Sequence, residues 1–79
     1  MIRGVDDLYN DLLEILKNSG FDDSAYVIQK HEECVAIFFE MKEAVEYFKV
    51  DFLESKLAED CMFEYKKVRN KHAAYIYSW

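Results

Sequence analysis

The sequence predicts a single α+β domain, spanning residues 1–79, whose elements follow the order α-β-β-α-β-β. Two segments place apolar residues at helical spacing, and four shorter segments are rich in the β-branched and aromatic residues of strands. No linker, internal repeat or low-complexity tract interrupts the chain. Hydrophobic residues make up 52% of it, with two Gly and no Pro, as is typical of a folded and not a disordered protein.

The first helix is expected over residues 5–18. Its apolar residues recur at helical spacing: Val5, Leu8, Leu12, Ile15 and Leu16. Gly20 is placed to end the helix, because glycine adopts a positive φ without a steric penalty. The apolar Phe21 that follows is the usual cap contact.

Two strands are expected next, at residues 25–30 and 33–40, separated by the polar pair His31-Glu32. The second strand is apolar on both faces, which suits a central position in a sheet.

A second helix is expected over residues 42–58. Val45, Phe48 and Phe52 align along one side of it, with Leu53 and Leu57 as further candidates for the same side. Part of this segment, VEYFKV, also alternates as a strand would, but its length and its Glu and Lys content favour a helix.

The last two strands are expected at residues 61–68 and 72–79. The segment VRNKH between them supplies the turn, with Asn70 as the residue that best tolerates a positive φ.

This element order has a structural implication. Moving the last strand to the front gives β-α-β-β-α-β, which resembles the ferredoxin-like arrangement. A circularly permuted version has a four-stranded antiparallel sheet, with both helices on one face. Across the sheet, the strands follow the order third, fourth, second, first, counted along the chain. The final strand therefore lies in the interior of the sheet, and its last residues are part of the core.

The final strand predicts an aromatic sheet face. If Ala74 and Ile76 point towards the helices, then Tyr75, Tyr77 and Trp79 line the opposite face, which two helices cannot also cover. Phe63 and Tyr65 on the neighbouring strand could join them. The alternative is the inverse assignment, in which these rings form the core beneath the helices.

An open aromatic face has three competing uses: docking of a partner protein, pairing with a second copy as a homodimer, or stacking of single-stranded nucleic acid. The nucleic-acid alternative uses the aromatic face together with the basic last hairpin: Tyr65, Lys66, Lys67, Arg69 and Lys71. The net charge of −6 disfavours it globally.

Carboxylates on the two helices predict a second surface. They are Asp7, Asp11 and Glu14 on the first helix and Glu43, Glu46, Asp51 and Glu54 on the second. They serve either solubility alone or contact with a Lys- and Arg-rich site on a partner. We therefore expect a small acidic protein-binding module. It acts as an inhibitor or adaptor that occludes a basic site on a larger partner, of the kind that binds nucleic acid.

In size and charge the chain is similar to inhibitors from phages and mobile elements, including anti-CRISPR proteins. No motif in it matches a particular family. A homodimer with a ligand-binding or enzymatic role in the cleft between its subunits is a third possibility.

The sequence offers little for catalysis or for cofactor or metal binding. HEEC (residues 31–34) lacks the helical spacing that brings two His ligands onto one metal, and there is no Gly-rich phosphate loop. Cys34 and Cys61 lie in apolar strands, as small buried hydrophobes do. We expect no enzyme, no cofactor and no metal site. With no bilayer-spanning run and no signal-peptide pattern, a cytosolic location is expected, with both thiols reduced.

Overall fold

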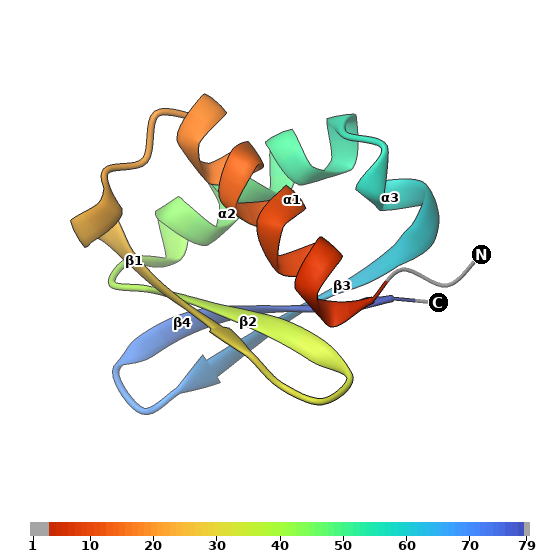
Figure 1. Cartoon of the computed structure of the whole chain (residues 1–79). Helices are drawn as coiled ribbons and strands as arrows, with labels where there is room; N and C mark the ends of the chain where they lie inside the picture. The colour runs from red at the N-terminus through yellow and green to blue at the C-terminus, as the bar shows by residue number, and fades with distance from the viewer. Residues whose placement is uncertain (1–3, 79) are drawn as a thin grey trace.

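The computed structural model describes residues 4–78, and it shows one open, four-stranded antiparallel sheet with helices along one face (Figure 1). Its elements are α1 (Val5–Asn18), the 3-10 turn η1 (Asp23–Ala25), β1 (Tyr26–Lys30), β2 (Cys34–Phe39), α2 (Lys42–Glu54), α3 (Leu57–Asp60), β3 (Cys61–Val68) and β4 (Lys71–Ser78). The strand order is β1-β2-β4-β3, as predicted, so β4 lies in the interior between β2 and β3.

Helix α1 forms and ends where its sequence indicates. Leu8, Leu12 and Leu16 are fully buried along one side of the helix. Gly20 has a φ of +86°, and the N–H of Phe21 donates to the carbonyl of Leu16 at 3.1 Å. This hydrogen bond satisfies a carbonyl that the helix end would leave unpaired, and it returns Phe21 to the core.

Helix α2 ends earlier than predicted. Its inward residues Val45, Phe48 and Phe52 are buried as expected, but the backbone leaves the helix at Ser55, whose ψ is 167°. The Ser55 N–H and hydroxyl both donate to the carbonyl of Phe52, which closes the helix. Leu57 is buried, but it belongs to the separate helix α3. Leu53 is 55% exposed, so its assignment to the inward side was wrong.

The core lies between the helices and one face of the sheet. Ile37 of β2 and Ala74 and Ile76 of β4 are fully buried on this face, packed in one cluster with the inward side chains of α1 and α2. Tyr75 and Tyr77 alternate to the opposite face, as predicted, so the inverse assignment is wrong. Trp79 lies outside the described residues.

Phe63 and Tyr65 do not join Tyr75 and Tyr77, contrary to the prediction. Phe63 pairs with Ile76 in the β3–β4 register, and its ring centroid lies 5.4 Å from that of Phe52 beneath the helices. Tyr65, two residues on, points to the same side as Phe63. The sequence does not reveal this because the side that each β3 residue faces is set by the register with β4.

The register is fixed by a tight turn between β3 and β4. Arg69, and not Asn70 as predicted, has the positive φ of 58° in this turn. Asn is the more usual residue at such a φ, so composition alone pointed to the wrong position.

The interior position of β4 makes a stability prediction. Ile76→Ala should lower the free energy of unfolding by about 2–5 kcal/mol, because it opens a cavity in the core that the described residues 4–78 of this small domain form. Val27→Ala on edge strand β1, where Val27 is 54% exposed, is the matched control and should cost less than about 1 kcal/mol. Urea denaturation followed by circular dichroism measures both. Equal costs would contradict the assigned burial.

Candidate interaction surfaces

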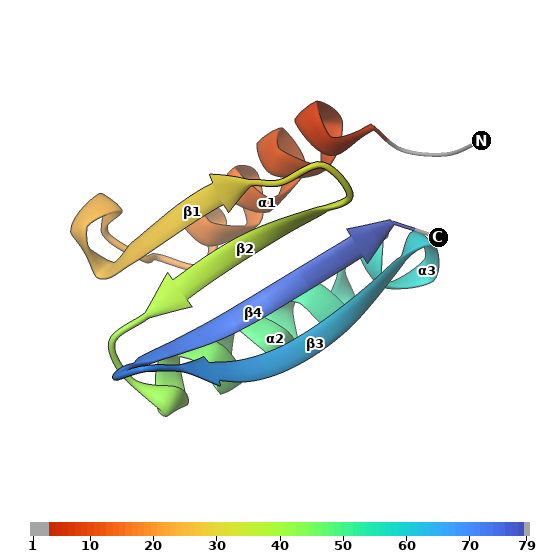
Figure 2. The same ribbon diagram turned by 90° about the horizontal axis from the view of Figure 1, so that it is seen from below.

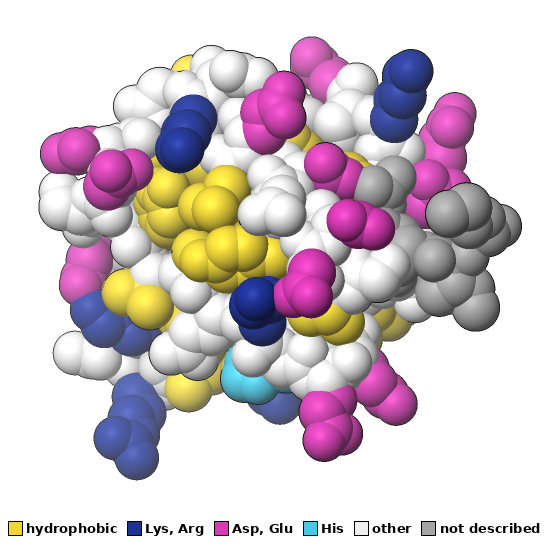
Figure 3. All heavy atoms as spheres, viewed as in Figure 1, with side chains coloured by type: hydrophobic (Ala, Val, Ile, Leu, Met, Phe, Trp, Pro, Cys, Tyr) yellow, Lys and Arg dark blue, Asp and Glu magenta, His cyan; other side chains and the backbone are white. Residues whose placement is uncertain are grey.

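Charge is segregated between the two layers of the fold. Residues 5–25 and 42–60, which hold the helices, carry twelve Asp and Glu against four Lys, a net charge of −8. Residues 26–41 and 61–78, which hold the strands and their hairpins, carry four acids against five Lys and Arg, a net charge of +1. Figure 3 shows carboxylates spread over the helices, with basic side chains among them and further basic side chains towards the lower left. The two sides therefore suit partners of different charge.

Helix α2 is apolar on its outer side as well as its inner side. Tyr47, Val50 and Leu53 are 61%, 56% and 55% exposed, and they follow one another at intervals of three residues. Side chains at this spacing are neighbours on a helix surface. We call these three residues the α2 ridge. A helix that is apolar all round is normally covered on all sides, whereas the outer side of α2 faces solvent.

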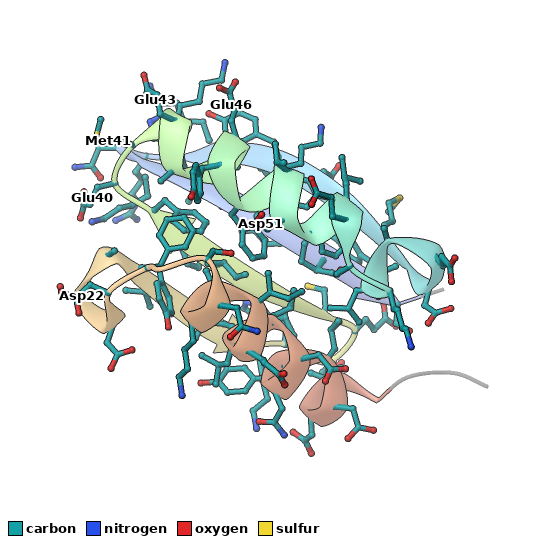
Figure 4. All side chains as sticks on the ribbon, turned by 90° about the horizontal axis from the view of Figure 1, so that it is seen from above. Asp22, Glu40, Met41, Glu43, Glu46 and Asp51 are labelled. Carbon is teal, nitrogen blue, oxygen red and sulfur yellow. The ribbon has the colours of Figure 1, made fainter. Side chains whose placement is uncertain are left out.

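Three glutamates border the α2 ridge. Glu43, Glu46 and Glu54 are exposed on the outward part of the helix, and Figure 4 shows Glu43 and Glu46 on the side turned away from α1. An apolar centre with a charged rim is the usual anatomy of a protein interface. The sequence reasoning found the glutamates and missed the ridge. The signal was available, because apolar residues fall on both sides of this helix.

The remaining predicted acids lie nearer to α1. Figure 4 shows Asp51 on the side of α2 that faces α1. Asp51, Asp11 and Glu14 line shallow depressions along α1, while Asp7 is exposed in its first turn. The seven predicted carboxylates therefore fall into two groups and do not form one continuous surface. One group borders the α2 ridge, and the other lies along α1 and the side of α2 that faces it.

The sheet face opposite the helices has no cover within the described residues 4–78 (Figure 2). By strand register, its middle two rows run across β1, β2, β4 and β3 as Gln29, Ala36, Tyr75 and Glu64, and as Val27, Phe38, Ala73 and Lys66. Tyr77 and Met62 extend one side of these rows, and Lys71 and Val68 the other. We call this the uncovered sheet face.

Aromatic rings form a thin layer on the uncovered sheet face. Tyr75 stands opposite Ala36, and Phe38 stands opposite Ala73, with the two rings edge-to-face at 6.3 Å between centroids. Both alanines are fully buried although no helix covers them, which shows that the neighbouring rings shield them. The rings themselves are only half-buried, so their outer sides remain accessible.

The residues proposed for nucleic-acid binding are divided between the two sheet faces. Lys66 lies on the uncovered sheet face, with its Nζ 6.0 Å from the centroid of the Tyr75 ring. Lys71 lies there too and pairs with Glu40. Tyr65 and Lys67 lie on the helix side, where Tyr65 stacks on His72 and hydrogen-bonds to its Nδ1 at 2.7 Å. Arg69 lies in the turn. Tyr65 therefore cannot extend a stacking surface made by Tyr75 and Tyr77.

A third apolar area lies between α1 and β1 and is visible near the centre of Figure 3. Its half-buried members, which include Tyr9 and Ile28, already pack against the core. Lys30 closes over it, with its Nζ 5.2 Å from the Tyr9 ring and 2.9 Å from Asp6 Oδ1. The hydrogen bond from Lys30 to Asp6 raises the pKa of the lysine.

The His, Cys, Asp and Glu side chains of residues 4–78 are distributed over several helices, strands and turns. In the described part of the chain, no three His, Cys, Asp or Glu side chains are grouped to hold a metal ion. His31, Glu32 and Glu33 are exposed in the β1–β2 hairpin. Burial raises the pKa of the Cys34 thiol, and Glu33 raises it further, which makes it a poor nucleophile.

Comparisons with models of known protein families, with curated proteins and with solved structures find no match for this chain. No helix within residues 4–78 has both the length and the apolar character that crossing a membrane requires.

The environment of Cys34 predicts low reactivity. At pH about 8, native Cys34 should react with iodoacetamide at least about tenfold more slowly than in the unfolded chain, because its raised pKa and its burial both reduce accessible thiolate. The rate should go on increasing as the pH rises beyond the ordinary thiol pKa of about 8.5, where the rate of an unshifted thiol levels off. Peptide mass spectrometry separates Cys34 from Cys61. Equal rates in the folded and unfolded chains would contradict this assignment.

Proposed function

We propose that the protein is a small binding module that docks the α2 ridge into an apolar groove on a larger protein. The observation that carries the proposal is the exposure of Tyr47, Val50 and Leu53, each by more than half, in the middle of a helix whose other side is already buried in the core. Helices that bind grooves present apolar anchors at this three- and four-residue spacing. Exposed apolar patches on small domains commonly mark such sites.

Charge defines the partner. Glu43, Glu46 and Glu54 border the ridge, and the whole helical layer has a net charge of −8. A groove edged by Lys and Arg complements this surface, which accelerates association and excludes acidic competitors. A second copy is disfavoured at this site, since it would bring carboxylates against carboxylates. We therefore propose a basic site on the partner, which the module occludes as an inhibitor or adaptor.

We also interpret the topology as that of a circularly permuted ferredoxin-like domain. Placing β4 before α1 yields the order β-α-β-β-α-β with the same strand neighbours. This interpretation rests on element order and strand adjacency, and the function proposed for α2 does not depend on it.

Paired variants test the docking proposal. Val50→Ser/Leu53→Ser should lower partner affinity by at least about tenfold, because anchor residues at the centre of an interface dominate its energy. Val27→Ser is the matched apolar control, since Val27 and Val50 are similarly exposed at 54% and 56%. Glu43→Lys/Glu46→Lys should also weaken binding, while Glu32→Lys/Glu33→Lys changes the net charge equally at the distant hairpin and should not.

The measurement is affinity capture from extracts of the native source at low and high salt, with quantitative mass spectrometry of the retained proteins. The proposal predicts a basic protein that the wild type and both controls retain and that both α2 variants, Val50→Ser/Leu53→Ser and Glu43→Lys/Glu46→Lys, lose. Equal retention by all five proteins, or dependence on the hairpin pair instead of the helix pair, would contradict it.

A further inference from the structure

We propose that two copies of the chain pair through the uncovered sheet face, separately from the docking of α2. The arrangement of residues on this face makes it complementary to itself. Its apolar centre is formed by Phe38, Tyr75 and their shielded alanines, and its charged groups stand along the β3 edge. A two-fold symmetric dimer needs one surface that fits its own image.

The charge distribution identifies a second copy as the occupant. At a net charge of −6 two chains repel each other, and the acidic helical layer is the source of that repulsion. The uncovered sheet face instead carries Glu64 and Lys66, and the pair of Glu40 with Lys71 at its end. These four charges sum to zero. On this side two copies can approach without opposing like charges.

One orientation of the two-fold axis brings complementary residues of the two copies opposite one another. The axis lies between the two sheets, crosses the strands at right angles and passes between the two middle rows. Each strand then faces its own copy running in the opposite direction. Glu64 of one chain faces Lys66 of the other, Tyr75 faces Ala73, and Phe38 faces Ala36. Large side chains thus meet small ones in the centre, and opposite charges meet at the rim.

An axis parallel to the strands fits less well. It also sets Tyr75 opposite Ala36, but it leaves Glu64 facing Gln29 and Lys66 facing Val27 across the interface. Sheets that pack face to face are rotated by about 30°. Near the edge of this sheet that rotation shifts residues by a few ångströms, which the long Glu and Lys side chains can span.

The size of the face sets the expected strength. The four strands hold 27 residues, and each residue covers about 3.3 Å along its strand and about 4.8 Å across it, which gives roughly 400 Å² per copy. This is smaller than the roughly 800 Å² per partner of a standard interface. The dimer should therefore form reversibly and depend on protein concentration, leaving the α2 ridge on the outside of both copies.

A charge swap tests the register of the dimer. Sedimentation equilibrium of the wild type at low salt should show an average mass that increases with concentration from the 9.4 kDa of one chain towards twice that value. Glu64→Lys and Lys66→Glu should each weaken dimerisation by at least about tenfold, because each places like charges opposite one another. The double variant Glu64→Lys/Lys66→Glu should recover it, since the exchanged charges again face opposite partners.

Lys67→Glu is the matched control, because Lys67 is exposed on the same strand but on the helix side of the sheet. It should leave the dimer unchanged. Glu64 and Lys66 are both exposed, and thermal melting checks that each variant is folded. The proposal is overturned if the wild type stays monomeric at every concentration, if neither single swap has an effect, or if the double swap is as weak as the singles. A monomer that instead retains a single-stranded oligonucleotide would also overturn it, and would assign the face to nucleic acid.

Discussion

The structure depends on the pairing of β4 between β2 and β3. This strand contributes Ala74 and Ile76 to the core and hydrogen-bonds on both of its edges, so it joins the two hairpins into one sheet. The two long helices cover only one face of that sheet. A chain of 79 residues has no further element with which to cover the other face within its described part. The surfaces available for binding follow from this limit.

The same limit explains why α2 is exposed on its outer side. Its inward residues Val45, Phe48 and Phe52 complete the single core, and no additional layer packs above them in residues 4–78. Val50 and Leu53 are not part of that core, and Tyr47 touches it through an edge-to-face contact with Phe21, at 5.7 Å between ring centroids. Three exposed apolar side chains at intervals of three residues favour association over solubility, whereas the surrounding glutamates restrict which partner can approach. In the proposed docking, the apolar ridge supplies affinity and the bordering glutamates supply specificity.

Much of this architecture could be predicted from the sequence, because local signals and the global fold agree. Gly20 marked the end of α1, and the alternation along β4 separated Ala74 and Ile76 from Tyr75 and Tyr77, although the sequence left open which of the two sides lies under the helices. The end of α2 could not be predicted, because it depends on Ser55, a residue compatible with either conformation. The face occupied by Phe63 and Tyr65 required the β3–β4 register, which alternation within one strand does not contain.

The candidate sites were predicted less completely than the fold. The acids on both helices were identified, but their division into two groups depends on how α2 is rotated against α1, which only packing determines. The rotation of α2 also decides the position of Leu53, which the sequence offered as a further candidate for the inward side and which is exposed. Tyr75 and Tyr77 were placed correctly. Phe38, whose ring contacts Tyr75 across the strands, was not identified, because its strand is apolar on both faces and its sequence does not show which face Phe38 occupies.

Amide hydrogen exchange tests the central position of β4 most directly. Between residues 73 and 77, β4 has β2 on one edge and β3 on the other, so every amide of this segment points to a neighbouring strand. The outer edges of β1 and β3 have no neighbour in the described sheet. The account predicts that exchange in β4 and β2 requires global unfolding and is the slowest in the protein. Exchange in β4 as fast as in the outward amides of β1 and β3 would contradict the sheet order and the uncovered sheet face inferred from it.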